Sequence, residues 1–274
     1  MSEARQQFAA AVSRPDDRID LAEAALLIAR EEYPELEVGA YLRRLDELAA
    51  TARPSVNPDS PAAEQVAQLN RFMFVERGFA GNRDNYYDPR NSYLNEVLDR
   101  RTGIPISLSL VYAEVAQRLD LPVYGVSFPG HFLVKYVGTS EIIVDPFFGM
   151  VITRQECWQR LHGIYGSKAR LEPRMLRPAS HREILVRLLS NLKQIYVDTA
   201  DFDRALACVD RILLLQPDDA RELRDRGILY QRLECYAAAL RDFERYLRLA
   251  PDDKAAALIR EGLPDLRRQA AMLQ

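Results

Sequence analysis

A repeated pattern near the C-terminus constrains the fold of this chain of 274 residues more than any other feature. Residues of one kind recur at an offset of 34 positions, in the pairs Phe202 and Tyr236, Ala205 and Ala239, Leu206 and Leu240, Pro217 and Pro251, Leu189 and Leu223, and Tyr196 and Tyr230. Repeats of this length are helix pairs that stack because a single pair cannot bury its apolar face alone. We therefore predict two repeats, about 186–219 and 220–253, with a capping helix from Asp253 onward.

The small and aromatic positions of these units, and the Pro-Asp-Asp that ends each one, resemble tetratricopeptide repeats. The resemblance implies a superhelical groove that holds a protein or peptide partner. The second unit also contains a charged cluster. It could bind an acidic peptide, pack against the core domain, or form an ordinary solvated surface, which is the simplest interpretation for most of its members. Its members are Arg221, Arg224, Asp225, Arg226 and Arg232.

Composition and charge exclude several classes of protein. With 48% hydrophobic and 28% charged residues, the chain has the composition of a soluble globular protein. The net charge of −3 and the pI near 5.8 provide no basic field for a phosphate backbone, so no nucleic-acid partner is expected. The charged start of the chain is unlike a signal peptide, and no window has the uninterrupted apolar length of a membrane span. We expect a cytoplasmic protein with no membrane association.

The cysteines and histidines provide little material for a metal or disulfide site. Cys157, Cys208 and Cys235 are widely spaced and odd in number, which favours reduced thiols. The histidines are His131, His162 and His181, too few for a centre with several imidazole ligands. No cofactor and no metal are expected.

The region before the repeats reads as a mixture of helices and a small sheet. Helical spacing marks residues 17–80, and a polar loop from Gly81 to Ser92 leads to a short helix over 93–101. An apolar helix over 107–119 is followed by strands over 123–128, 132–137 and 142–144, then by a helix over 153–164. The pattern predicts an α+β core over residues 1–180 and an all-α module over 181–274.

The register of two predicted strands places a histidine beside an aspartate. If Val137 pairs with Glu141 across the intervening turn, Leu133 lies opposite Asp145. His131 shares a face with Leu133, so His131 and Asp145 become diagonal neighbours, with backbones roughly 7–8 Å apart. A carboxylate in that position can orient an imidazole and stabilise its charged form.

Ser107 completes the residue types of a catalytic triad. It lies at the start of the apolar helix, where the helix dipole and backbone N–H groups can stabilise developing negative charge. Each member also has a structural alternative: Ser107 as a helix cap, His131 as a satisfied core histidine, and Asp145 before Pro146 as a turn former.

Three segments resemble the SirB-type branch of the transglutaminase-like superfamily: Gly-Ile-Pro-Ile-Ser-Leu-Ser-Leu from Gly103, Phe-Pro-Gly-His-Phe from Phe128, and Val-Asp-Pro-Phe from Val144. The resemblance covers nearly the whole chain, because the repeat tail is common in that branch. It implies a papain-like core in which a helix bearing the nucleophile packs on an antiparallel sheet bearing His131 and Asp145. The family's catalytic cysteine corresponds to Ser107, and no cysteine lies nearby.

This departure leaves two functions open. The first is a non-catalytic protein-interaction or regulatory module, which we favour because lost thiol chemistry accompanies a binding module. The alternative is acyl transfer or amide hydrolysis, with Ser107 as nucleophile, His131 as general base and then acid, and Asp145 as orienter. Candidate substrate contacts in the polar loop are Asn82, Tyr87 and Asn91, for which turn and capping roles are the alternative.

Overall fold

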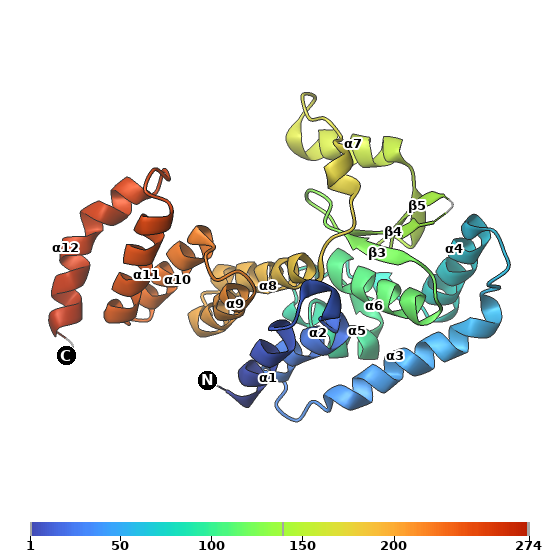
Figure 1. Cartoon of the computed structure of the whole chain (residues 1–274), viewed down its shortest axis with the longest axis horizontal. Helices are drawn as coiled ribbons and strands as arrows, with labels where there is room; N and C mark the ends of the chain where they lie inside the picture. The colour runs from blue at the N-terminus through green and yellow to red at the C-terminus, as the bar shows by residue number, and fades with distance from the viewer. Residues whose placement is uncertain (1, 139, 273–274) are drawn as a thin grey trace. The chain divides into compact units, whose positions relative to one another are not determined.

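The computed structural model describes residues 2–138 and 140–272 of the chain (Figure 1). These residues divide into two compact units, residues 1–188 and 189–274. The division falls inside the helix α8 (His181–Asp198), whereas the sequence placed a boundary at residue 180. Each unit is described by itself below.

The first unit is the α+β core that the sequence predicted. Its helices before the sheet are α1 (Glu3–Val12), α2 (Leu21–Arg30), α3 (Val38–Ala52), α4 (Ala62–Asn70), α5 (Leu94–Arg100) and α6 (Pro105–Arg118). A π-helical turn (Arg71–Glu76) continues α4, and α7 (Arg154–Tyr165) follows the sheet. The sequence did not predict α1, whose stripe of buried residues holds only two large apolar side chains, Phe8 and Val12.

The central helix α6 is shaped by the chemistry of its first turn. Pro105 occupies the first helical position, where its missing N–H costs no hydrogen bond. The helix therefore begins two residues before the predicted start. Its first twelve residues are all buried, from Pro105 to Ala116, which makes α6 the core helix of this unit.

The sheet has four antiparallel strands in the order β3 (Val123–Val126), β4 (Leu133–Val137), β5 (Glu141–Asp145) and β6 (Met150–Ile152). Val137 pairs with Glu141, which confirms the predicted register. The short edge strand β6 was not predicted. A second, parallel pair joins β1 (Ala80–Gly81) to β2 (Thr102–Gly103), directly before α6.

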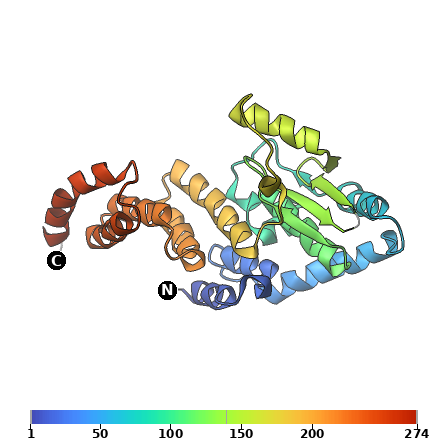
Figure 2. The same ribbon diagram turned by 45° about the horizontal axis from the view of Figure 1, so that its top comes forward.

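The two faces of the four-stranded sheet are covered by different helices. α6 and α7 lie on opposite sides of it (Figures 1 and 2). On the α7 side, side chains of the strands and the helix form one buried apolar cluster that includes Leu133, Ile143, Cys157 and Leu161. Side chains alternate along a strand, so Leu133 and Asp145 share this α7 side.

The second unit consists of helices, as the repeat pattern predicted. After the end of α8 come α9 (Phe202–Leu215), α10 (Ala220–Arg232), α11 (Tyr236–Leu249) and α12 (Ala256–Met272). The repeated small positions are buried, because Ala205 and Ala239 each have 0% exposure. Throughout residues 2–138 and 140–272, none of the helices combines the length and apolar character that crossing a bilayer requires.

Candidate functional site

His131 and Asp145 are in direct contact. The imidazole Nε2 lies 3.0 Å from Oδ2 of Asp145, a hydrogen-bonding distance. His131 precedes β4 and Asp145 ends β5, so the strand register brings them together as the sequence predicted. The carboxylate is fully buried, whereas the imidazole remains 16% exposed.

The Asp145 carboxylate has two further partners. Arg160 of α7 forms an ion pair with Oδ2, and the backbone N–H of Phe147 donates to Oδ1 at 3.0 Å. Burial by itself would raise the pKa of Asp145, but His131 and then Arg160 outweigh it through hydrogen bonds and charge. The pKa of Asp145 is therefore lowered, and the carboxylate is ionised at neutral pH.

The hydrogen bond to Asp145 orients the imidazole of His131. With an ionised acceptor at Nε2, that nitrogen carries the proton, and Nδ1 is left as the second ring nitrogen. Within residues 2–138 and 140–272, Nδ1 has no hydrogen-bond partner. Phe147 meets the ring edge to face and Phe148 stacks on it, each at 6.2 Å between ring centroids.

Aromatic and cationic side chains extend the surface around His131. Phe148 is 44% exposed, with the guanidinium of Arg83 4.8 Å and that of Arg160 5.3 Å from its ring centroid. Tyr86 contacts Phe147 at 6.0 Å between centroids. The sequence analysis missed Arg83, Arg160 and Phe148, because nothing in the local pattern distinguishes them from ordinary surface or core residues, and it quoted Phe147 only as the end of the segment Val-Asp-Pro-Phe.

Ser107 lies at the start of α6 and bonds to the backbone. Its Oγ donates to the carbonyl oxygen of Asn91 at 2.5 Å and accepts from the N–H of Ile104 at 3.1 Å. The residue is 1% exposed. A hydroxyl has one hydrogen to donate, so this donation to Asn91 leaves none for an imidazole.

Within residues 2–138 and 140–272, no hydrogen bond joins Ser107 to His131. A Cβ on Gly103 would lie 2.6 Å from Ser107 Oγ, and Gly103 pairs with Gly81 of β1. A Cβ on Gly81 would in turn lie 2.5 Å from the ring of Phe147, the ring that meets His131.

The polar loop between β1 and α5 is held together by its own asparagines. Asn91 has 0% exposure, and its side chain donates to the carbonyl oxygens of Asn85 and Tyr86. Asn82 donates to the Asn91 side-chain oxygen at 3.0 Å. These bonds are the turn-forming role that the sequence left open as an alternative. Tyr87 differs from both asparagines because 69% of it is exposed.

No cysteine lies where the resemblance would place the family's nucleophile. Cys157 is fully buried in α7, and burial raises the pKa of its thiol above the ordinary value of 9.0. Cys208 is buried and Cys235 is exposed, and both belong to the second unit. Within the described ranges, three or more His, Cys, Asp or Glu side chains nowhere form a group that could hold a metal ion.

The charged cluster of the second unit forms ion pairs inside the repeats. Arg226 contacts Asp242 at 2.6 Å and Asp210 at 3.0 Å, and only 22% of its side chain is exposed. Lys193 likewise lies 2.7 Å from Glu222 and 3.0 Å from Asp225. Arg226 and Asp225 are therefore partly buried in ion pairs, whereas one interpretation of the sequence placed this cluster on a solvated surface.

Comparison with known proteins agrees with this architecture. Residues 39–190 match the transglutaminase-like superfamily, and residues 192–264 match the tetratricopeptide repeat. A UPF0162 protein of Xylella fastidiosa is 43% identical over 256 residues, which cover 92% of this chain and 91% of that protein. UPF0162 proteins of Pseudomonas aeruginosa and Vibrio cholerae are 38% and 32% identical, covering 85% and 89% of this chain and 85% and 91% of those proteins. The chain therefore belongs to the UPF0162 family, within the transglutaminase-like superfamily, and carries C-terminal tetratricopeptide repeats.

Proposed function

We propose that the chain acts as a protein-interaction or regulatory module whose transglutaminase-like core does not perform acyl transfer. The observation that carries this proposal is the hydrogen bonding of Ser107. Its hydroxyl is buried, donates to the carbonyl oxygen of Asn91 and accepts from the N–H of Ile104, and the second of these is a helix-capping bond. The partner is a protein or peptide held by the repeats and by the surface around His131.

Acyl transfer needs a nucleophile within hydrogen-bond reach of its base. Ser107 donates to the carbonyl oxygen of Asn91, and no hydrogen bond joins it to His131 within residues 2–138 and 140–272. Cys157 cannot substitute, because burial disfavours its thiolate, the form that attacks a carbonyl. Both candidate nucleophiles of the core therefore lack the activation that the chemistry requires.

Two features support a binding role. Tetratricopeptide repeats present extended surfaces to partners, and this chain has them over residues 192–264. In the core, Tyr87 exposes 69% of its surface, and Phe148 exposes 44% with the guanidinium of Arg83 over its ring. Exposed aromatic side chains next to arginine are enriched in protein interfaces.

A photocrosslinking residue in place of Tyr87 tests the binding role in cells. We expect it to capture a defined partner protein, and we expect capture to fall at least tenfold when Phe148→Ala is added. The matched control places the same residue at Glu47, an exposed position of α3. Equal capture from both positions, or no effect of Phe148→Ala, would count against the proposal.

An acyl-directed serine probe tests the absence of catalysis. We expect Ser107 to remain unlabelled at every pH, in a reaction where a known serine hydrolase is labelled as a positive control. Labelling of Ser107 that disappears in the His131→Ala variant would refute the non-catalytic assignment.

One observation favours a second function, a hydrolase with a Ser-His-Asp version of the triad. His131 is oriented by an ionised carboxylate 3.0 Å away, and its Nδ1 has no partner within residues 2–138 and 140–272. In that mechanism Ser107 attacks a carbonyl, and His131 takes its proton and then returns it to the leaving group. The Ser107 side chain would first have to release the carbonyl oxygen of Asn91.

The Ser107→Cys variant separates the two functions. In a working site, His131 would activate the new thiol, and its alkylation would slow by at least tenfold in the Ser107→Cys, His131→Ala double variant. In a non-catalytic core, the thiol remains buried against the Asn91 carbonyl, and its alkylation rate is the same with and without His131.

A further inference from the structure

A small pocket lies between α3, α5 and the loop after the π-helical turn, and none of its residues belongs to the proposed function. Its volume is about 100 Å³, roughly the space of three water molecules at about 30 Å³ each. It therefore has room for one small group and not for a drug-sized molecule, which needs about 300–1,000 Å³. The lining residues are Arg44, Leu48, Arg77, Phe79, Leu98 and Arg101.

Two arginines of this pocket have no carboxylate partner within residues 2–138 and 140–272. The guanidinium of Arg77 lies over the Phe72 ring, 4.9 Å from its centroid. Such a contact uses the face of the cation and leaves the N–H donors in its plane unused. Nη1 of Arg101 donates one N–H to the carbonyl oxygen of Arg77 at 3.1 Å, so this second guanidinium lies beside the Arg77 main chain. Most donors of both side chains are therefore available to a ligand.

The acidic residues next to these positions in the chain do not line the pocket. Asp99 forms an ion pair with Arg44, so Arg44 is already neutralised and is not counted as a ligand. Glu76 lies 3.3 Å from Arg71, which belongs to the same π-helical turn. The exposed Glu47 of α3 is not a lining residue either. Among the described residues, the pocket thus has two positive charges without a carboxylate beside them.

The backbone of Arg101 is a second, independent observation that points to a ligand. Arg101 ends α5 in the left-handed conformation, with φ 53° and ψ 29°. Glycine is preferred at this position of a helix, because a side chain strains a left-handed backbone. Residues held in such strain cluster at functional sites. The strain here holds a cation at the pocket, with no acidic side chain in the described part of the chain to account for it.

We propose that this pocket binds the phosphate group of a small phosphate monoester, whose oxygens accept hydrogen bonds from Arg77 and Arg101. A phosphate monoester carries between about 1.5 and 2 negative charges at pH 7, which matches two guanidinium groups. Guanidinium suits phosphate because its N–H donors form parallel, charge-assisted bonds to two oxygens. The pocket holds the phosphate alone, so the organic part of the ligand extends outside it.

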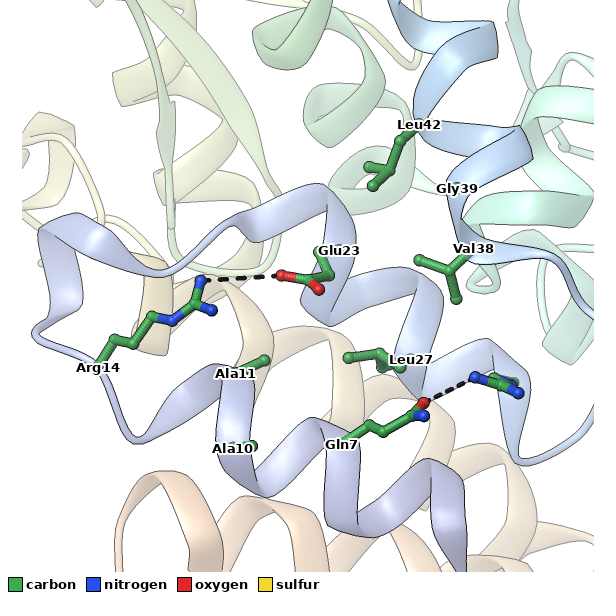
Figure 3. Close-up of a pocket in the computed structure, with 10 residues that line it drawn as sticks. Gln7, Ala10, Ala11, Arg14, Glu23, Leu27, Val38, Gly39 and Leu42 are labelled. Carbon is green, nitrogen blue, oxygen red and sulfur yellow. Dashed lines mark hydrogen bonds and ion pairs between the residues drawn. The ribbon is translucent and has the colours of Figure 1, made fainter.

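A larger groove on the N-terminal helices provides a contrast, because its arginines are paired with acids. It lies between α1, α2 and α3 and has a volume of about 500 Å³ (Figure 3). Arg14 forms an ion pair with Glu23, which itself lines the groove, and Arg30 forms one with Glu3, each at 3.9 Å. The charges of that groove compensate one another, so we expect no phosphate to bind there.

Titration of the full chain with phenyl phosphate at constant ionic strength, followed by backbone amide NMR shifts, tests the proposal. We expect saturable binding that shifts amides of residues 77–79 and 98–101 and leaves those of α1 unchanged. Inorganic phosphate should bind at the same residues, because it has the same charged group. Benzoate has the same ring but one negative charge, and it should bind at least tenfold more weakly.

The pH dependence of binding identifies the charge state of the bound group. The second pKa of a phosphate monoester is about 6, whereas guanidinium stays charged throughout this range. Lowering the pH from 7.5 to 5 should therefore weaken the binding of phenyl phosphate at least threefold. Sulfate keeps two charges over the same range, so its affinity should not change.

Two variants and one matched control identify the site. Arg101→Gly removes the guanidinium and also the backbone strain, since glycine readily adopts a positive φ. We expect it to weaken phenyl phosphate binding at least tenfold without lowering the melting temperature, and Arg77→Gln to weaken binding as strongly. Arg43→Gln removes the same charge from an exposed position of α3 that does not line the pocket, and it should change the affinity less than about twofold.

Several results would overturn the proposal. Shifts that fail to saturate, benzoate binding as tight as that of phenyl phosphate, or unchanged affinity in Arg101→Gly would each show that the pocket does not recognise a phosphate group. Equal weakening in Arg43→Gln would assign the binding to the general charge of the surface. Binding of inorganic phosphate without phenyl phosphate would restrict the pocket to the free anion and rule out the monoester.

Discussion

The end of the sheet at His131 and the start of α6 at Ser107 both bury polar groups, but they satisfy them differently. At the sheet end, Asp145 takes hydrogen bonds from the His131 imidazole and the Phe147 N–H and an ion pair from Arg160, so two of its three partners are side chains. At the helix start, Ser107 bonds only to backbone groups. The contrast teaches that residue types alone do not establish a triad, because the direction of each hydrogen bond decides which groups are free to react.

The largest expected effect is at the sheet end. Asp145→Ala leaves Arg160 and His131 without their buried carboxylate, and we expect a loss of about 3 kcal/mol in the free energy of unfolding. Urea denaturation measures it. Asp84→Ala, at an exposed aspartate of the polar loop, is the control and should change stability by less than about 0.5 kcal/mol. Equal effects of the two substitutions would show that the carboxylate of Asp145 does not organise the sheet end.

A smaller effect is expected at the helix start. Ser107→Ala removes the bonds to Asn91 and Ile104 and should cost about 1–2 kcal/mol of unfolding free energy. Ser109→Ala is an unusually close control: Ser109 lies on the same helix, is also 1% exposed, and its Oγ has no hydrogen-bond partner in the described residues. Because it removes an unsatisfied group, it should be neutral or slightly stabilising. If Ser109→Ala costs as much as Ser107→Ala, the capping role of Ser107 is wrong.

The pH dependence of stability should separate the two regions further. The pKa of Asp145 in the folded chain lies below its ordinary value of 3.8. The contribution of Asp145 to the free energy of unfolding is therefore fully present above that value, and it is lost as pH falls through the folded-state pKa. Unfolding curves measured at decreasing pH should show this loss in the wild type and in Ser107→Ala but not in Asp145→Ala. A parallel loss in all three proteins would assign the acid sensitivity to other carboxylates.

The smallest expected effect is a difference in the reactivity of the thiols, which is measured without any substitution and so without any change in stability. A thiol reagent at neutral pH should modify the exposed Cys235 at least tenfold faster than Cys157, whose burial raises its pKa. Mass spectrometry of the native chain over time gives both rates. Fast modification of Cys157 would show that the core keeps a reactive thiol close to Asp145, and the non-catalytic proposal would then lose one of its supports.

Local patterns predicted much of the fold. The offset of 34 residues predicted the repeat helices, and β alternation predicted three of the four strands of the main sheet. α1 and β6 were missed because α1 has a weak apolar stripe and β6 has only three residues. The contact of His131 with Asp145 could be predicted from the sequence, because the turn between β4 and β5 fixes the register of these neighbouring strands.

The sequence by itself determined the transglutaminase-like core, the repeats, and the pairing of His131 with Asp145. Each of these depends on residues close together in the chain or on strands whose register is fixed by one turn. Only the tertiary structure decided that Arg160, fifteen residues after Asp145, completes the carboxylate's partners, and that Ser107 donates to Asn91. The physical reason is that an imidazole, a guanidinium and a hydroxyl each have several possible partners. Which one each receives depends on how helices and strands far apart in the chain pack together.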